Sequence, residues 1–243
     1  MDKTDQLKQI IDQSKYLVFF GGAGVSTASG IPDFRSATGL YNQRTGSKYP
    51  PEVMLSYSFF KKHPSEFFDY HLQNLIARDA RPNPAHLALA ELEKRGILKA
   101  VITQNIDRLH QQAGSINVIE LHGNTFEFYC EHCRAPYNLA YVDASQGIPR
   151  CQKCGGMVRP NVVLYEEALD PTVLEDAEYE IRKADTLLIG GTSLVVYPAA
   201  GLLQFFHGRN LVMINRDPTP MDSLATLLVH GDIAEILSKA VFG

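Results

Sequence analysis

Four cysteines form two Cys-x-x-Cys pairs, and the chain has no other cysteine. Cys130 pairs with Cys133 and Cys151 with Cys154, and 17 residues separate the two pairs. This spacing is typical of a four-cysteine zinc site, in which the thiolates surround the metal as a tetrahedron. Such a site leaves no coordination position for water or substrate. We therefore expect one structural zinc, which excludes zinc-catalysed hydrolysis.

A glycine-rich turn follows the first apolar run of the chain. Residues 16–20 lead into the sequence GGAGVS at 21–26. Glycines let the backbone approach a phosphate closely, and a following helix end offers free N–H groups. The turn departs from the dinucleotide-binding fingerprint, because Thr27 occupies the third glycine position and no acidic residue follows about 20 positions later. A hydride-transferring dehydrogenase would need that acid to bind the ribose of its cofactor. The alternative that this is only a tight turn, with no ligand, also remains.

Other polar residues also follow apolar runs. His122 comes after residues 118–121, and a histidine with an ordinary pKa near 6.5 suits proton abstraction at neutral pH. A lone histidine after a strand is more often structural, however. Asn105 and Asp107 follow another run, where either could simply cap a helix.

Short runs rich in Val, Ile and Leu predict the strands that position these residues, and they alternate with helical patterns. The runs lie at 16–20, 100–103, 118–121, 162–165, 186–189, 211–214 and 227–229. The helical patterns lie at 4–14, 83–95, 105–113, 171–183, 199–207 and 232–240. This alternation predicts an α/β fold with a Rossmann-like parallel sheet and helices on both faces. Ligands then bind at the carboxyl ends of the strands.

Two stretches interrupt the alternation. Residues 36–81 carry loop signals and helical pieces around 52–60 and 64–78, and residues 126–159 carry the cysteines. We expect both to be inserts that pack together as a small zinc-binding and helical domain. The remaining segments, 1–35, 82–125 and 160–243, would form the larger, Rossmann-like domain.

Composition limits the partners. The formal charge of −4 argues against nucleic acid held by bulk electrostatics, although a basic peptide would be compatible with it. The first residues lack the layout of a signal peptide, and no run approaches the roughly 20 apolar residues of a membrane span. We expect a cytoplasmic protein without a membrane partner; its oligomeric state stays unknown.

Several of these motifs occur together, in the order in which the sirtuin family carries them. GAGVS at 22–26 with GIPDFR at 30–35 resembles the first signature, TQNID at 103–107 the second, and LHG at 121–123 the third. The cysteine pairs, GTSL at 191–194 and Asn215 follow. The chain resembles the sirtuins from about residue 8 to 240. The resemblance implies an NAD-dependent protein deacylase that uses His122 as general base, together with Asn105.

The resemblance also assigns the residues that contact NAD. They are Ala23, Thr27, Phe34, Arg35, Gln104, Asn105, Ile106, Asp107, His122, Thr192, Ser193, Asn215 and Asp232. The turn and Arg35 would contact the phosphates, Phe34 would lie over the nicotinamide, and Asp107 would grip its carboxamide. Asn215 and Asp232 would meet the adenosine half. Asp232 could equally cap the last helix, and a cap and a ligand contact can coexist.

The implied reaction consumes NAD as a co-substrate. An acetyl or other uncharged acyl group passes from lysine to ADP-ribose, nicotinamide leaves, and His122 takes a proton from a ribose hydroxyl. The main alternative is an NAD-dependent protein ADP-ribosyltransferase, which shares the first step. An NAD-sensing or zinc-scaffold binding module is the alternative without catalysis, and it would tolerate the loss of His122.

The implied substrate is an acyl-lysine protein or peptide, which would lie as a strand between residues 162–167 and 194–197. Val163, Tyr165 and Leu194 would contact it. Glu166 stands where many sirtuins carry glycine, and an acid there could favour basic substrates.

A second comparison concerns the acyl group. Desuccinylating sirtuins hold the acyl carboxylate with a tyrosine and an arginine, and our alignment places His71 and Asn74 at those positions. We therefore predict weak desuccinylation.

Overall fold

The larger part of the molecule is built on one parallel sheet. A computed structural model describes residues 2–33, 39 and 49–243. Its main sheet has six strands in the order β3-β2-β1-β7-β8-β9, and every neighbouring pair is parallel. In chain order the strands are β1 Leu17–Gly21, β2 Leu98–Thr103, β3 Val118–Glu120, β7 Thr186–Gly190, β8 Asn210–Asn215 and β9 Leu227–His230. All five residues of β1 are buried, as expected of a central strand covered on both faces.

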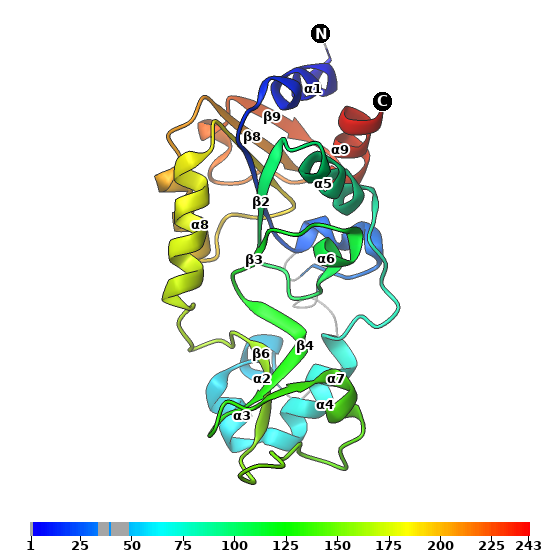
Figure 1. Cartoon of the computed structure of the whole chain (residues 1–243), viewed down its shortest axis with the longest axis vertical. Helices are drawn as coiled ribbons and strands as arrows, with labels where there is room; N and C mark the ends of the chain where they lie inside the picture. Colours follow the sequence, from blue (N-terminus) through cyan, green and yellow to red (C-terminus); the bar gives the residue numbers. More distant parts are fainter. Residues whose placement is uncertain (1, 34–38, 40–48) are drawn as a thin grey trace.

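Helices cover both faces of this sheet (Figure 1). One face packs against α1 (Lys3–Gln13), α5 (Pro84–Lys94) and α9 (Ile233–Phe242). The other packs against α8 (Pro171–Lys183) and a 3₁₀ helix at Ala199–Phe205.

Helix α5 begins where its sequence predicts. The Asn83 side chain accepts a hydrogen bond from Ala85 N, and His86 Nδ1 accepts one from Asn83 N, so two otherwise unpaired N–H groups are satisfied.

A second, smaller part lies at the opposite end from the chain termini (Figure 1). Its antiparallel sheet has the order β5-β4-β6, with β4 Gly123–Cys130, β5 Pro136–Asn138 and β6 Val158–Val162. Four helices accompany it: α2 Pro51–Met54, α3 Tyr57–Lys62, α4 Pro64–Asn74 and α7 Leu139–Asp143. We call these seven elements the smaller lobe. Its core is aromatic, with Phe60 and Phe67 fully buried against each other at 5.0 Å between ring centroids.

The observed architecture confirms the α/β fold class. One predicted strand is wrong: the run 162–165 is not part of the parallel sheet, because Val162 ends β6 and Tyr165 makes only an isolated bridge with Ser56. Val162 and Leu164 are apolar because they enter the aromatic core of the smaller lobe. The limits proposed for the two domains stay a prediction.

Two predicted helices differ in detail. The helix expected at 105–113 begins only at Leu109, and the one expected at 199–207 is the 3₁₀ helix at Ala199–Phe205. Among the helices that the structure describes, none is long and apolar enough to cross a bilayer.

Candidate active site

A cavity of about 1220 Å³ lies where the carboxyl ends of the parallel strands meet the smaller lobe. Residues that follow β1, β2, β7 and β8 line it, which is where an open α/β sheet binds its ligands. Twelve residues predicted to contact NAD or peptide line it: Ala23, Thr27, Gln104, Asn105, Ile106, Asp107, His122, Thr192, Ser193, Asn215, Val163 and Tyr165. The volume exceeds the roughly 300–1,000 Å³ of ordinary small-molecule pockets, so it has room for a dinucleotide and a side chain together.

His122 lies between β3 and β4, with one ring nitrogen held by the backbone. Its Nδ1–H donates to the carbonyl oxygen of Gln104 at 2.9 Å, because a carbonyl can only accept. Nε2 is then the nitrogen without a proton, and no described residue bonds to it. Burial lowers the pKa of His122 below its usual 6.5, although the bond to Gln104 opposes this. The ring is therefore neutral at pH 7 and able to accept a proton.

Ser26 joins the two polar side chains that follow β2. It accepts a hydrogen bond from Asn105 Nδ2 at 3.0 Å and donates to Asp107 Oδ2 at 2.7 Å. The other Asp107 oxygen accepts from Leu109 N at 2.9 Å, so Asp107 also satisfies the start of α6 (Leu109–Ala113). Burial raises the pKa of Asp107, and these two hydrogen bonds oppose the rise. Sequence reasoning assigned no role to Ser26, although it lies within the first signature.

A second network connects the ends of β2, β7 and β8. Gln104 Nε2 donates to Thr192 Oγ1 at 3.0 Å, and Thr192 N donates to Asn215 Oδ1 at 3.0 Å. The Nδ2 of Asn215 is buried at the cavity without a hydrogen-bond partner among the described residues. An unsatisfied buried donor is costly, so it marks a position where a bound ligand would supply an acceptor.

The glycine-rich turn packs directly on the loop after β7. A Cβ at Gly24 would lie 2.8 Å from the Gly191 Cα, and one at Gly22 would lie 2.9 Å from the Thr192 Cβ. The turn is a pair of 3₁₀ segments, Ala23–Val25 and Thr27–Ser29, rather than the start of a long helix. Small residues are required here by packing, and the turn still exposes backbone to the cavity. Together with Asn215 and Asp107, it fits a dinucleotide.

One lining residue of the cavity belongs to an ion pair. Arg216 lines the wall and pairs with Asp232, whose other oxygen caps α9 through Ala234 N at 2.7 Å. Asp232 itself is not part of the lining. The capping role considered for it is confirmed, and its contact with NAD stays a prediction.

Residues 163–167 form the cavity wall beside the smaller lobe. Val163 N donates to the His122 carbonyl at 3.0 Å. Tyr165 N donates to Leu55 O at 3.1 Å, and Tyr165 O accepts from Tyr57 N at 3.0 Å. Val196, Tyr197 and Pro198 also line the cavity, whereas Leu194, the third predicted peptide contact, is buried and is not part of the lining.

Several lining residues received no individual role from the sequence. They include Ser26, Ile31 and Pro32 inside the first signature, Val196 inside the expected peptide edge, and Pro198 and the stretch 216–219 outside any motif. Most lie within a few residues of a recognised motif, which was the available signal. Two predicted contacts, Phe34 and Arg35, lie outside the described residues.

The four cysteines meet in the smaller lobe. Their sulfur atoms all lie within 4.8 Å of one another, and Cys130–Cys154 and Cys133–Cys151 are each 3.5 Å apart. A tetrahedron with Zn–S bonds of ~2.3 Å has edges of about 3.8 Å, so the donor set fits zinc.

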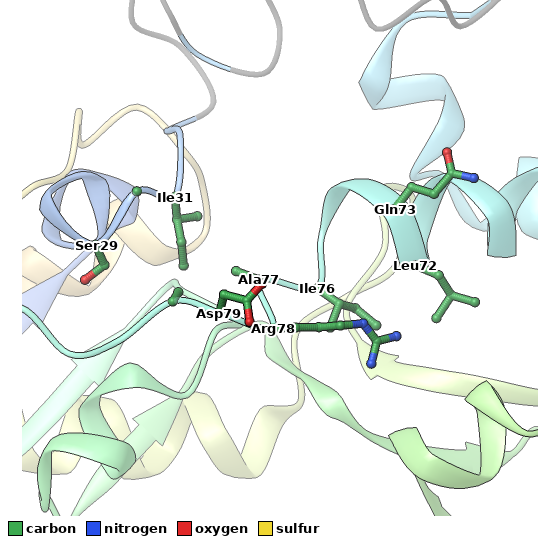
Figure 2. A pocket seen from close by; sticks show the side chains of 10 residues that line it. Ser29, Ile31, Leu72, Gln73, Ile76, Ala77, Arg78 and Asp79 are labelled. Carbon is green, nitrogen blue, oxygen red and sulfur yellow. The ribbon is translucent and has the colours of Figure 1, made fainter.

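A second cavity, of about 520 Å³, adjoins the first, because Gly30 and Ile31 line both. Figure 2 shows Ser29 and Ile31 on one side of it and Leu72 and Gln73 on the other.

The two residues compared with the desuccinylase pair do not both line the main cavity. Asn74 lines the main cavity, but His71 does not. His71 is fully buried, stacked on Phe67 at 5.7 Å between ring centroids.

Comparisons with known proteins agree with this geometry. The profile of the Sir2 family matches residues 22–198. An NAD-dependent protein deacetylase from Clostridium perfringens is 54% identical over 241 residues, which are 99% of each chain. A Sir2 structure with a deacetylated p53 peptide and 3′-O-acetyl ADP-ribose is 39% identical with a TM-score of 0.88, over 98% of this chain and 97% of that one. Another, with p53 peptide and NAD⁺, is also 39% identical with a TM-score of 0.84, over 98% and 96%. The signatures, the cavity and the cysteine site are thus those of one group of proteins, and the chain belongs to the Sir2, or sirtuin, family.

Proposed function

We propose that this protein is an NAD-dependent protein-lysine deacetylase, which transfers the acetyl group to ADP-ribose and releases nicotinamide. The observation that carries the proposal is the state of His122. Its Nδ1–H is fixed on the Gln104 carbonyl, its Nε2 is left as a base, and it lies on the wall of the cavity. The similar deacetylases and the Sir2 structures with peptide, NAD⁺ and O-acetyl ADP-ribose support the same activity.

The chain's own residues bind, orient and move a proton. NAD, when bound, supplies an electrophilic ribose carbon with nicotinamide as its leaving group, so no hydride is transferred. His122 takes a proton at Nε2 from a ribose hydroxyl, which makes that oxygen nucleophilic toward the acyl carbon. Ser26 fixes the amide of Asn105 and the carboxylate of Asp107, and these two with the Ile106 backbone hold the nicotinamide end.

The peptide lies beside residues 163–167, and Val196 and Tyr197 line the same cavity. Val163 O and Glu166 N make no hydrogen bond to any described residue, so they can pair with an added strand. A structural zinc on the four cysteines stabilises the smaller lobe, and we place the protein in the cytoplasm, where such thiols stay reduced.

Product analysis tests the proposal. The purified protein is incubated with an acetyl-lysine peptide, with and without NAD, and the products are identified by mass spectrometry. NAD-dependent loss of acetyl, with acetyl-ADP-ribose appearing, is the expected result. ADP-ribose attached covalently to protein, with acetyl-lysine unchanged, would instead establish the ADP-ribosyltransferase.

A further inference from the structure

The wall beside the peptide contains a strained residue. Glu166 has a backbone φ of +76°, in the left-handed region that glycine enters freely and other residues rarely adopt. Such a conformation persists only where the surroundings hold it, and it clusters at functional sites. The question is which contacts hold Glu166 in place.

Ser58 in the first turn of α3 holds the Glu166 carboxylate at both oxygens. Ser58 N donates to Oε2 and Ser58 Oγ donates to Oε1, each at 2.9 Å. Hydrogen bonds to an ionised acceptor are stronger than neutral ones, and two of them fix a direction as well as a distance. Both oxygens of the Glu166 carboxylate are therefore bonded to the smaller lobe.

The residues on either side of Glu166 are also held by hydrogen bonds. Tyr165 exchanges two backbone hydrogen bonds with Leu55 and Tyr57, immediately before Ser58. On the inner side, the Glu167 carboxylate accepts two bonds of 2.7 Å from the buried Arg159 and one of 2.9 Å from Leu164 N. Val163 O and Glu166 N, in contrast, have no hydrogen-bond partner among the described residues.

We propose that Glu166 is a positioning residue for the substrate peptide, because its bonds to Ser58 hold the turn 163–167 in the shape that presents the free Glu166 N–H. The inference rests on the proposed function, since it assigns this turn to peptide binding. It replaces the expectation that the Glu166 charge meets basic substrates directly. Substrate affinity then depends on Ser58, a residue that does not line the cavity.

Steady-state kinetics with two acetyl-lysine peptides, one neutral and one basic beside the acetyl-lysine, test this. Glu166→Ala and Ser58→Ala should both raise the KM of both peptides, by about tenfold and about threefold, while kcat and the KM for NAD stay near wild type. The double variant should be no worse than Glu166→Ala, because the pair acts as a unit. Lys61→Ala is the matched control: it removes the 2.8 Å ion pair between α3 and Glu131, and should leave peptide KM unchanged.

Two further readouts separate the outcomes. Hydrogen exchange at residues 57–59 and 163–167 should quicken in both single variants, with an unchanged melting temperature. Fluorescence anisotropy of a labelled acetyl-lysine peptide reports binding without turnover. If the wild type binds the peptide but never deacetylates it, the proposed function fails, and the affinities of the variants still decide the role of Glu166.

One pattern would overturn the positioning role. Ser58→Ala would have no effect, while Glu166→Ala weakened only the basic peptide. That pattern would mean that Glu166 meets substrate charge directly. Wild-type affinity of Glu166→Ala for both peptides would equally refute the proposal.

Discussion

At the scale of single residues, the cavity is organised around hydrogen bonds that fix polar side chains before any ligand arrives. His122 is held at Nδ1 and Asn105 at Nδ2, so each has its orientation decided by the protein. Preorganised groups of this kind need no rearrangement during the reaction.

Replacing His122 by alanine should greatly slow turnover and leave binding intact. The hydrogen bond at Nδ1 goes to a backbone carbonyl, so the loss of the ring removes no hydrogen bond to another side chain that the structure describes. We expect kcat to fall by about 10²–10⁴-fold, the range of a general base, with melting temperature and NAD affinity near wild type. Calorimetric titration with NAD and the peptide assay check this together. Activity like that of the wild type would show that another group accepts the proton.

The pH dependence of activity should follow the protonation of His122. Because burial lowers the pKa of His122, its neutral form persists below pH 6.5, and activity is lost only as the pH falls through that lowered pKa. The acid limb of kcat/KM should therefore have its midpoint below about 6.5. Circular dichroism at each pH controls for unfolding. A midpoint above 6.5 would contradict the assignment.

The order of the motifs in the sequence indicated most of the residues that line this cavity. It did not indicate contacts between residues that lie far apart in the chain. Ser26 resembles any serine in a tight turn, and its partners Asn105 and Asp107 lie 79 and 81 residues away. Nothing local indicates such a contact.

At the scale of elements, hydrophobic pattern predicted the strands of the large sheet but not every apolar run. Residues 162–165 have the composition of a buried strand, yet their partners are the aromatic residues of α3 and α4. An apolar run predicts that its residues are buried, but it does not predict whether they enter the core of the large sheet or that of the smaller lobe. The start of α6 was also placed too early, because residues 104–107 are held by contacts to the cavity networks.

Strand β5 contains no zinc ligand, but one of its side chains supports the zinc site through a hydrogen bond. Tyr137 in β5 donates its O–H to the Cys151 sulfur at 3.2 Å. Tyr137→Phe should lower zinc affinity by about 10–100-fold, as expected when a ligand loses its supporting hydrogen bond. Competition with a chromogenic chelator measures this. Tyr141→Phe is the control, because the Tyr141 hydroxyl bonds to Arg150 O and not to sulfur. Equal affinities of the two variants would refute the role.

At the scale of the whole molecule, buried histidines make both parts sensitive to acid. Burial lowers the pKa of His71 in the smaller lobe to about 4, and those of His86 and His110 near the large sheet to about 4 and about 3. Between pH 6.5 and 4 the unfolded chain therefore binds more protons than the folded one. The free energy of unfolding falls as pH falls, by up to about 1.4 kcal/mol per pH unit for each histidine.

His71→Leu isolates one of these contributions. Neither ring nitrogen of His71 has a hydrogen-bond partner among the described residues, so the variant removes two buried polar atoms and one titrating group. Urea unfolding from pH 7.5 to 4.5 should show a shallower loss of stability than the wild type, with a gap that widens toward acid. Parallel curves for the two proteins would show that His71 does not titrate in this range.

The pairing of β1 has a consequence for synthesis on the ribosome. On one side β1 pairs with β2, which follows within about the first hundred residues, but on the other Leu17 pairs with Thr186. The zinc ligands, in contrast, all lie between residues 130 and 154. The smaller lobe can therefore assemble once residues 162–164 have emerged, while one edge of the fully buried strand β1 is still uncovered. Until β7 appears, the nascent chain carries an unpaired apolar edge, which makes this interval the one in which it is most prone to aggregate.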